Sequence, residues 1–110
     1  MGMIIHTIKI KVLPDKRKEL SQTIFAIIDS IRKEKGCVSY NFYQDRESEN
    51  NLLLIGEWDM QEDLDNHLRS TTFSVLRGAM NLLSTPPEIK FNVVSYQAGT
   101  EALKAARGEL

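Results

Sequence analysis

The sequence contains a single cysteine, Cys37, among 110 residues. One cysteine cannot form an internal disulfide, and low cysteine usage is typical of a protein kept in a reducing compartment. Together with only two histidines it also provides too few ligands for a structural zinc site. We therefore expect a cytoplasmic protein that folds without disulfides and without a metal.

Long apolar runs are also missing, so the sequence predicts neither a membrane span nor a signal peptide. The charge is nearly balanced, with 14 Lys and Arg against 15 Asp and Glu, and no basic stripe stands out. This balance argues against nucleic acid and anionic membrane surfaces as partners. Apolar residues make up 42% of the chain and charged residues 26%, which are ordinary values for one water-soluble domain.

Four segments show the alternation of a β-strand. The first runs from Ile4 to Val12 and places four apolar β-branched residues and His6 on one face. The second and third, Cys37 to Gln44 and Leu52 to Trp58, flank a polar turn and predict a hairpin. Ile89, Phe91 and Val93 mark the fourth strand.

Two helical stretches separate these strands. The first shows one apolar stripe, with Asp15 as the expected N-cap and Gly36 as the expected stop. The second begins at Asp59, which forms a capping-box-like pair with Glu62. Ser70 interrupts it and offers a new N-cap for a further helical stretch.

The order strand, helix, hairpin, helix, strand predicts an α+β fold, a ferredoxin-like βαββαβ sandwich with a four-stranded antiparallel sheet. We expect one domain over residues 3–97 and a C-terminal tail over 98–110, with a short helix from Thr100.

The sheet face turned away from the helices is half apolar, whereas a solvated face should be mostly charged. A second copy would cover it, so we expect a homodimer. This outer face carries Ile5, Thr7, Tyr43, Leu53, Ile55, Val94 and Tyr96.

Several short stretches resemble the antibiotic biosynthesis monooxygenase family, including its quinol-monooxygenase branch. They are Pro14-Asp15-Lys16, Gly36-Cys37-Val38-Ser39-Tyr40, Ile55-Gly56-Glu57-Trp58, Leu64-Asp65-Asn66-His67-Leu68 and Pro86-Pro87-Glu88. The resemblance implies a dimeric α/β barrel with one pocket per subunit, between sheet and helices. It also implies oxidation of a small aromatic quinol or phenol by O₂ without a cofactor, which requires a base, polar groups for the phenolate and a dry cavity.

His67 is the expected catalytic base, because it lies on the apolar face of its helix where several branches of the family carry histidine. The alternative is that His67 caps the pocket or bonds a carbonyl. His6 points toward the helices and could bind the substrate oxygen or pair with His67, or be structural. Gly56 could leave a hollow for a flat ligand. The expected substrate-binding residues are His6, Tyr40, Phe42, Trp58, Phe73, Leu76 and Arg77.

Other activities of the fold fit less well. A haem-degrading branch of the superfamily uses asparagine, tryptophan and histidine at positions that align with His6, His67 and Arg77, so none of the three matches. An isomerase of a small phosphorylated signalling metabolite should need several basic residues in the pocket, and only Arg77 is near. A non-catalytic ligand-binding or dimerisation module remains an alternative, because a pocket with one histidine is compatible with an enzyme and with a binding module.

Overall fold

The computed structural model describes residues 3–109. The chain order is strand, helix, two strands, two helices, strand and helix. A 3₁₀ turn, η1 (Pro14–Lys16), precedes the first helix, and another, η2 (Met80–Leu82), follows the third. The strands are β1 (Ile4–Lys11), β2 (Cys37–Gln44), β3 (Asn51–Trp58) and β4 (Glu88–Val93); the helices are α1 (Arg17–Arg32), α2 (Gln61–Leu68), α3 (Thr71–Ala79) and α4 (Thr100–Ala106).

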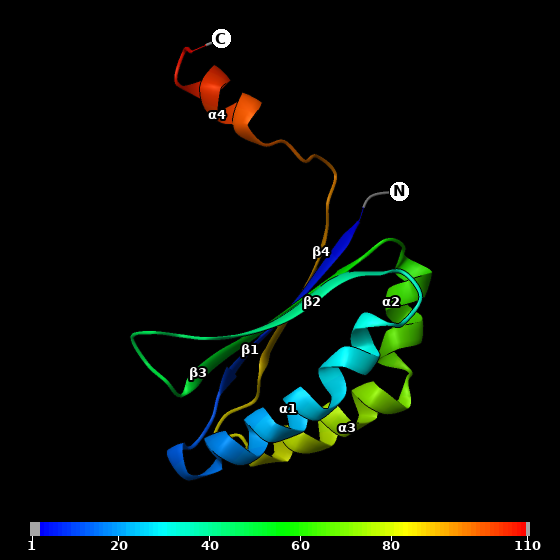
Figure 1. Cartoon of the computed structure of the whole chain (residues 1–110), viewed down its shortest axis with the longest axis vertical. Coiled ribbons are helices and arrows are strands. Elements are labelled where there is room, and N and C mark those ends of the chain that lie inside the picture. Colours follow the sequence, from blue (N-terminus) through cyan, green and yellow to red (C-terminus); the bar gives the residue numbers. More distant parts are fainter. Residues whose placement is uncertain (1–2, 110) are drawn as a thin grey trace.

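The four strands form one sheet in the order β2-β3-β1-β4, and every neighbouring pair is antiparallel. The exposure of β1 alternates residue by residue, since side chains of a strand point to opposite faces. The helices α1, α2 and α3 all cover the same face of this sheet (Figure 1). This arrangement confirms the ferredoxin-like α+β sandwich.

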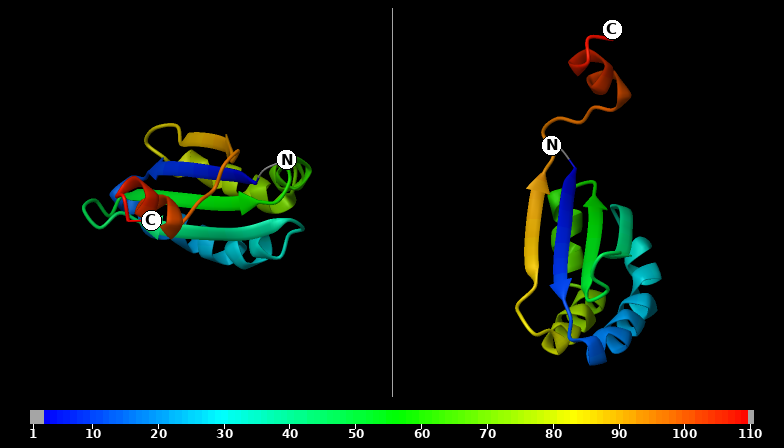
Figure 2. Two further views of the ribbon diagram at one scale, coloured as in Figure 1. Left: turned by 90° about the horizontal axis from the view of Figure 1, so that it is seen from above. Right: turned by 90° about the vertical axis from the view of Figure 1, so that its left-hand side faces the viewer.

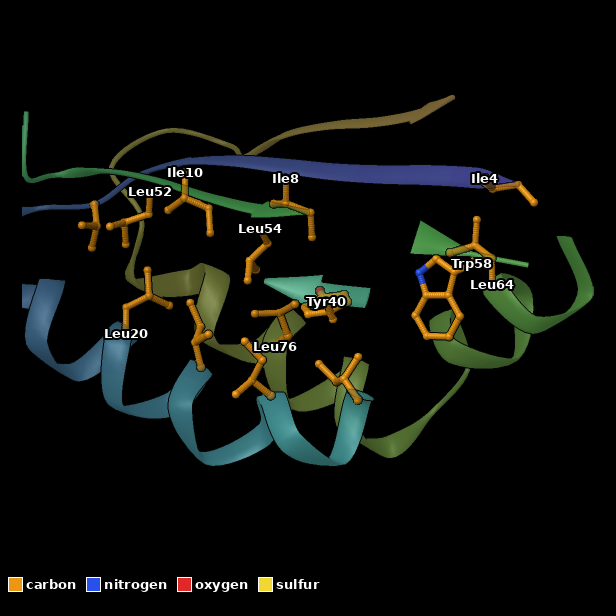
Figure 3. Close-up of a cluster of buried hydrophobic side chains, with 14 residues drawn as sticks. Ile4, Ile8, Ile10, Leu20, Tyr40, Leu52, Leu54, Trp58, Leu64 and Leu76 are labelled. Carbon is orange, nitrogen blue, oxygen red and sulfur yellow. The ribbon is translucent and has the colours of Figure 1, made fainter. Parts of the chain in front are cut away.

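The hydrophobic core fills the space between the sheet and these three helices (Figure 3). The isoleucines of β1 and the leucines of β3 meet the apolar stripe of α1, in which Leu20, Ile24, Ile28 and Ile31 are buried. Trp58 is fully buried, and its ring points from the sheet toward the helices (Figure 3). The core also contains Ile4, Ile8, Ile10, Leu52, Leu54, Leu64 and Leu76.

The predicted helix ends are partly wrong. Asp15 lies inside the 3₁₀ turn that begins at Pro14, so α1 starts at Arg17 with no side-chain cap. Asp59 is also not a cap, because α2 begins two residues later and Met60 occupies the N-cap position. Gly36 follows the end of α1 by four residues and closes the next turn at φ +80°. The Ser70 cap is confirmed, since its Oγ accepts a hydrogen bond from the Phe73 N–H at 3.1 Å.

Strand β4 lies at the edge of the sheet, and the helices do not cover it (Figure 2). Its pairing with β1 places Phe91 beside His6 on the helix-facing side. Phe91 is nevertheless 50% exposed to solvent, and Ile89 and Val93 are similarly exposed. The edge strand therefore presents an apolar strip at the side of the core.

Helix α4 lies beyond the end of the sheet, apart from the other helices (Figures 1 and 2). Its first residue, Thr100, is where the sequence predicts a helix to start, and none of its residues is buried. Within residues 3–109, no helix combines the length and the apolar character that a membrane crossing requires.

Candidate functional site

Six aromatic rings gather at the end of the sheet near α2, and His67 lies at their centre. The Trp58 ring stacks on His67 with centroids 4.6 Å apart, while the Phe73 and Tyr40 rings approach it edge-on at 5.3 and 5.7 Å. The His6 ring lies 6.4 Å from His67 and stacks on Phe91 at 4.6 Å. We refer to His6, Tyr40, Trp58, His67, Phe73 and Phe91 as the aromatic cluster.

The elements of the fold explain why these rings meet. His6 and Trp58 lie on the core-facing sides of the neighbouring strands β1 and β3, and Tyr40 occupies the same side of β2. His67 lies on the buried face of α2, next to Leu64. Phe73 is held in the first turn of α3, where its N–H bonds to the Ser70 cap.

Five polar atoms of this cluster are buried and have no hydrogen-bond partner in the described part of the chain. They are both ring nitrogens of His6, the Tyr40 hydroxyl, the Trp58 indole nitrogen and Nε2 of His67. Each buried polar atom left unpaired costs about 1–3 kcal/mol, so native proteins normally pair such atoms. Their concentration around one point is the pattern of a site that binds polar groups of a ligand.

The second nitrogen of His67 does have a partner. Its Nδ1 lies 3.0 Å from Oε1 and 3.3 Å from Oε2 of Glu34, which follows the end of α1. The His67 side chain is fully buried and that of Glu34 is 23% exposed. The carboxylate therefore contacts the histidine from the solvent side of the cluster.

Burial determines the ionisation of the cluster. Desolvation lowers the pKa of His67 to about 4, and desolvation together with the nearby His67 lowers the pKa of His6 to about 4. Both imidazoles are therefore neutral at pH 7. Burial, with smaller effects of Cys37 and Glu34, raises the pKa of the Tyr40 hydroxyl, so Tyr40 remains a phenol that can donate a hydrogen bond.

Of the residues that the sequence predicts for the site, His6, Tyr40, Trp58, His67 and Phe73 come together here. The other three are not part of the aromatic cluster. Phe42 packs edge-on against Phe25 at 5.6 Å, Leu76 is a core residue, and Arg77 is exposed on α3.

Gly56 does not leave the expected hollow. A Cβ at this position would lie 2.7 Å from Cδ2 of Tyr40 and 3.0 Å from Nε1 of Trp58. The Tyr40 ring therefore fills the space that the missing side chain makes, and Gly56 serves the close packing of the cluster.

Two hollows, of about 630 and 580 Å³, are instead present on the outer face of the sheet. The larger is lined by Lys9, Tyr43 and Leu53, the smaller by Ile5 and Tyr96. Neither is lined by a residue of the aromatic cluster. Among residues 3–109, no three His, Cys, Asp or Glu side chains are grouped so that they could hold a metal ion.

Sequence reasoning missed two residues of this region, Glu34 and Phe91. Glu34 stands between Lys33 and Lys35 and reads as part of a solvated helix end, 33 residues away from His67. Phe91 reads only as one apolar position of a strand. The alternation of side chains along β1 and the last strand could have placed Phe91 on the same sheet face as His6. No short-range sequence signal identifies Glu34.

Comparison with known proteins gives consistent results. Residues 3–78 match the model of the antibiotic biosynthesis monooxygenase family. An uncharacterised Synechocystis protein is 37% identical over 82 residues, which cover 74% of this chain but only 56% of that longer protein. The crystal structure of a conserved Methanosarcina mazei protein superposes with a TM-score of 0.80 at 30% identity, covering 84% of this chain and 93% of the other.

The fold is shared more widely than the sequence. The structure of Rv0793 from Mycobacterium tuberculosis covers 89% of this chain and all of its own, with a TM-score of 0.82 at 24% identity. The family model spans more than half of the chain and includes every residue of the aromatic cluster except Phe91. The chain belongs to the antibiotic biosynthesis monooxygenase family.

Proposed function

We propose that this protein is a cofactor-independent monooxygenase that oxidises a small aromatic quinol or phenol with O₂. The observation that carries the proposal is the set of five buried, unpartnered polar atoms around His67. Membership of the monooxygenase family supports it. A flat substrate with oxygen substituents would supply both the aromatic surface and the polar groups that this cluster lacks.

The proposed reaction assigns a separate task to each polar group. Neutral His67 accepts the phenolic proton at Nε2, while the Trp58 N–H and the Tyr40 hydroxyl donate to the oxygen that becomes negative. The resulting phenolate gives electrons to O₂. One oxygen atom replaces a single ring C–H with C–OH. The two hydroxyl groups of the quinol become carbonyls, and the two hydrogens lost overall leave with the second oxygen atom as water, so the products are a hydroxyquinone and water. The four electrons all come from the quinol.

Access to His67 requires movement of a side chain. His67 and His6 are each only 1% exposed, whereas Phe91 stacks on His6 and is half exposed at the edge of the sheet. In our proposal the Phe91 ring moves aside when a substrate enters, and it shields the reacting groups from water afterwards.

Arg77, the basic residue that the sequence places near the pocket, is exposed on α3 and is not part of the aromatic cluster, which disfavours a phosphorylated substrate and hence the isomerase alternative. The binding-module alternative explains the same unpartnered atoms without a reaction. Turnover is therefore the observation that separates the two.

We also propose that two copies pack through their outer sheet faces. The pairing places Thr7 beside Ile55 and Tyr43 beside Leu53 on this face. Tyr43 and Tyr96 are 51% and 78% exposed. A half-apolar sheet face of this kind on a small protein is typical of an interface.

The test of the proposed function is turnover under ¹⁸O₂. Naphthalene- and anthracene-type hydroquinones are incubated with the protein, autoxidation is subtracted, and the products are analysed by mass spectrometry. We expect one ¹⁸O atom in the hydroxyquinone and the other in water. Tight binding of these compounds without turnover above autoxidation would instead support a binding module.

A further inference from the structure

We propose that Glu34 is the positioning residue of the site: it holds His67 in the tautomer that carries its proton on Nδ1 and leaves the lone pair on Nε2. This inference rests on the proposed function for its catalytic consequence, but its structural content stands separately. No other side chain of the described residues hydrogen-bonds to the His67 ring.

The chemistry of the contact selects the tautomer. A carboxylate has only acceptor atoms, and both oxygens of Glu34 lie within 3.3 Å of Nδ1. Nδ1 must therefore carry the hydrogen in this contact. Because burial keeps the imidazole neutral, Nε2 then has no proton. Burial raises the pKa of Glu34, but 23% exposure of its side chain to solvent favours the carboxylate at neutral pH.

The backbone fixes Glu34 for this task. Its N–H donates to the Ile31 carbonyl at 3.0 Å, and its own carbonyl accepts from the Cys37 N–H at 3.1 Å. The turn is closed by Gly36 at φ +80°, and the Gly36 carbonyl accepts from the Asp59 N–H at 2.9 Å just before α2. These hydrogen bonds connect the turn that carries Glu34 to the end of α1 and to the segment directly before α2.

The other face of the imidazole is fixed by packing. The Trp58 ring stacks on it at 4.6 Å with an interplanar angle of 26°, and the Phe73 and Tyr40 rings bound its edges. These contacts are apolar and do not distinguish the two tautomers. Without Glu34, the ring is free to take the Nε2–H form, which cannot accept a proton from a substrate.

The experiment reads the tautomer directly by long-range ¹H–¹⁵N NMR of the imidazole rings at pH 7.5, in the substrate-free protein. We expect the wild-type His67 ring to show protonated Nδ1 and unprotonated Nε2. In Glu34→Leu, which has no acceptor, the Nε2–H form should appear. Glu62→Gln is the control, because Glu62 is exposed on α2 and its removal should leave the wild-type pattern. A wild-type Nε2–H tautomer, or a wild-type pattern in Glu34→Leu, would overturn the proposal.

Kinetics give the second readout. Removal of a group that orients a catalytic side chain typically costs about 10–100-fold in activity, so kcat for the hydroquinone should fall by this factor in Glu34→Leu. KM should change much less, and Glu34→Asp should restore part of kcat. If the wild-type protein oxidises no hydroquinone, the proposed function fails, while the NMR result still decides the role of Glu34. Equal kcat values for wild type and Glu34→Leu would contradict the positioning role.

Discussion

At the scale of single residues, the site is a set of polar groups that the fold keeps out of water. His6 and His67 are each 1% exposed and are held neutral, although the unfolded chain would protonate both near pH 6.5. Their unpartnered nitrogens lower the stability of the fold. Such a cost is typical of functional sites, where polar groups are arranged for a ligand rather than for one another.

The buried histidines predict how stability depends on pH. Because their folded pKa values are about 4 and their unfolded values about 6.5, the unfolded chain binds more protons between these two pH values. Stability should be complete above pH 6.5 and should fall as the pH drops to 4, by on the order of 3 kcal/mol for each histidine. Urea unfolding at a series of pH values measures this slope.

The control is a variant with both His6→Gln and His67→Gln. It keeps every carboxylate, and of these only Glu34 contacts one of the substituted histidines, so the variant removes mainly the contribution of the histidines. Between pH 6.5 and 4, the free energy of unfolding should fall more steeply with decreasing pH in the wild type than in the variant. Parallel curves would show that neither imidazole is held neutral by burial.

Substitution of two glycines by alanine should change the stability of the fold in opposite directions. A Cβ on Gly56 would press on Tyr40 and Trp58, so Gly56→Ala should destabilise the fold by about 1–3 kcal/mol through overpacking. A Cβ on Gly78, in the helix α3, meets nothing within 4 Å, so Gly78→Ala should stabilise by about 0.5–1 kcal/mol. The denaturation midpoints of the two variants, compared with that of the wild type, measure both stability changes. A neutral Gly56→Ala would mean that the Tyr40 ring does not occupy this space.

The sequence identified the residues of the cluster that strand parity and helix periodicity control. His6 and Trp58 face the core because each strand alternates, and His67 does so because it shares a helical face with Leu64. Glu34 could not be found in this way, since its contact with His67 depends on how the turn after α1 meets α2. This tertiary contact joins segments that are distant in the sequence, so it leaves no local sequence pattern.

At the scale of elements, helix types and order followed from the sequence more reliably than helix ends. Asp15 and Asp59 have the right chemistry for N-caps, but neither is at the N-cap position. Pro14 favours a tight turn before α1, and Asp59 is engaged through its backbone with Gly36. Ser70 works as a cap because its backbone is extended directly before α3.

These caps predict unequal effects of similar substitutions. Ser70→Ala should destabilise the protein by about 1 kcal/mol, because the Phe73 N–H loses its acceptor. Asp59→Ala should remain within about 0.5 kcal/mol, since the side chain makes no capping bond. Thermal unfolding of the two variants measures the difference. A larger loss for Asp59→Ala than for Ser70→Ala would contradict the assignment of the caps.

At the scale of the whole molecule, the outer sheet face predicts the assembly. Light scattering of the wild type at micromolar concentration should give about twice the chain mass of 12.5 kDa. Ile55→Asp would place a charge in the proposed interface at a cost of several kcal/mol and should produce monomers. Val75→Asp, at an exposed position of α3, is the control and should stay dimeric. A monomeric wild type would remove this proposal without affecting the aromatic cluster.

The central claim, that neutral His67 takes the substrate proton at Nε2, is tested most directly by comparing wild type with His67→Gln. Gln is polar and of similar size but cannot act as a base. Trp58 is the only tryptophan and stacks on His67, so its fluorescence reports substrate binding in both proteins.

The measurement is oxygen uptake with a hydroquinone, corrected for autoxidation, at substrate concentrations set by that binding curve. We expect His67→Gln to bind the substrate but to lose about 10²–10⁴-fold in kcat. In the wild type, kcat/KM should rise with pH only near the His67 pKa of about 4 and show no further rise from His67 above it. Equal kcat values in the two proteins from pH 5 to 8 would show that His67 is a packing residue, and the account of the site would be wrong.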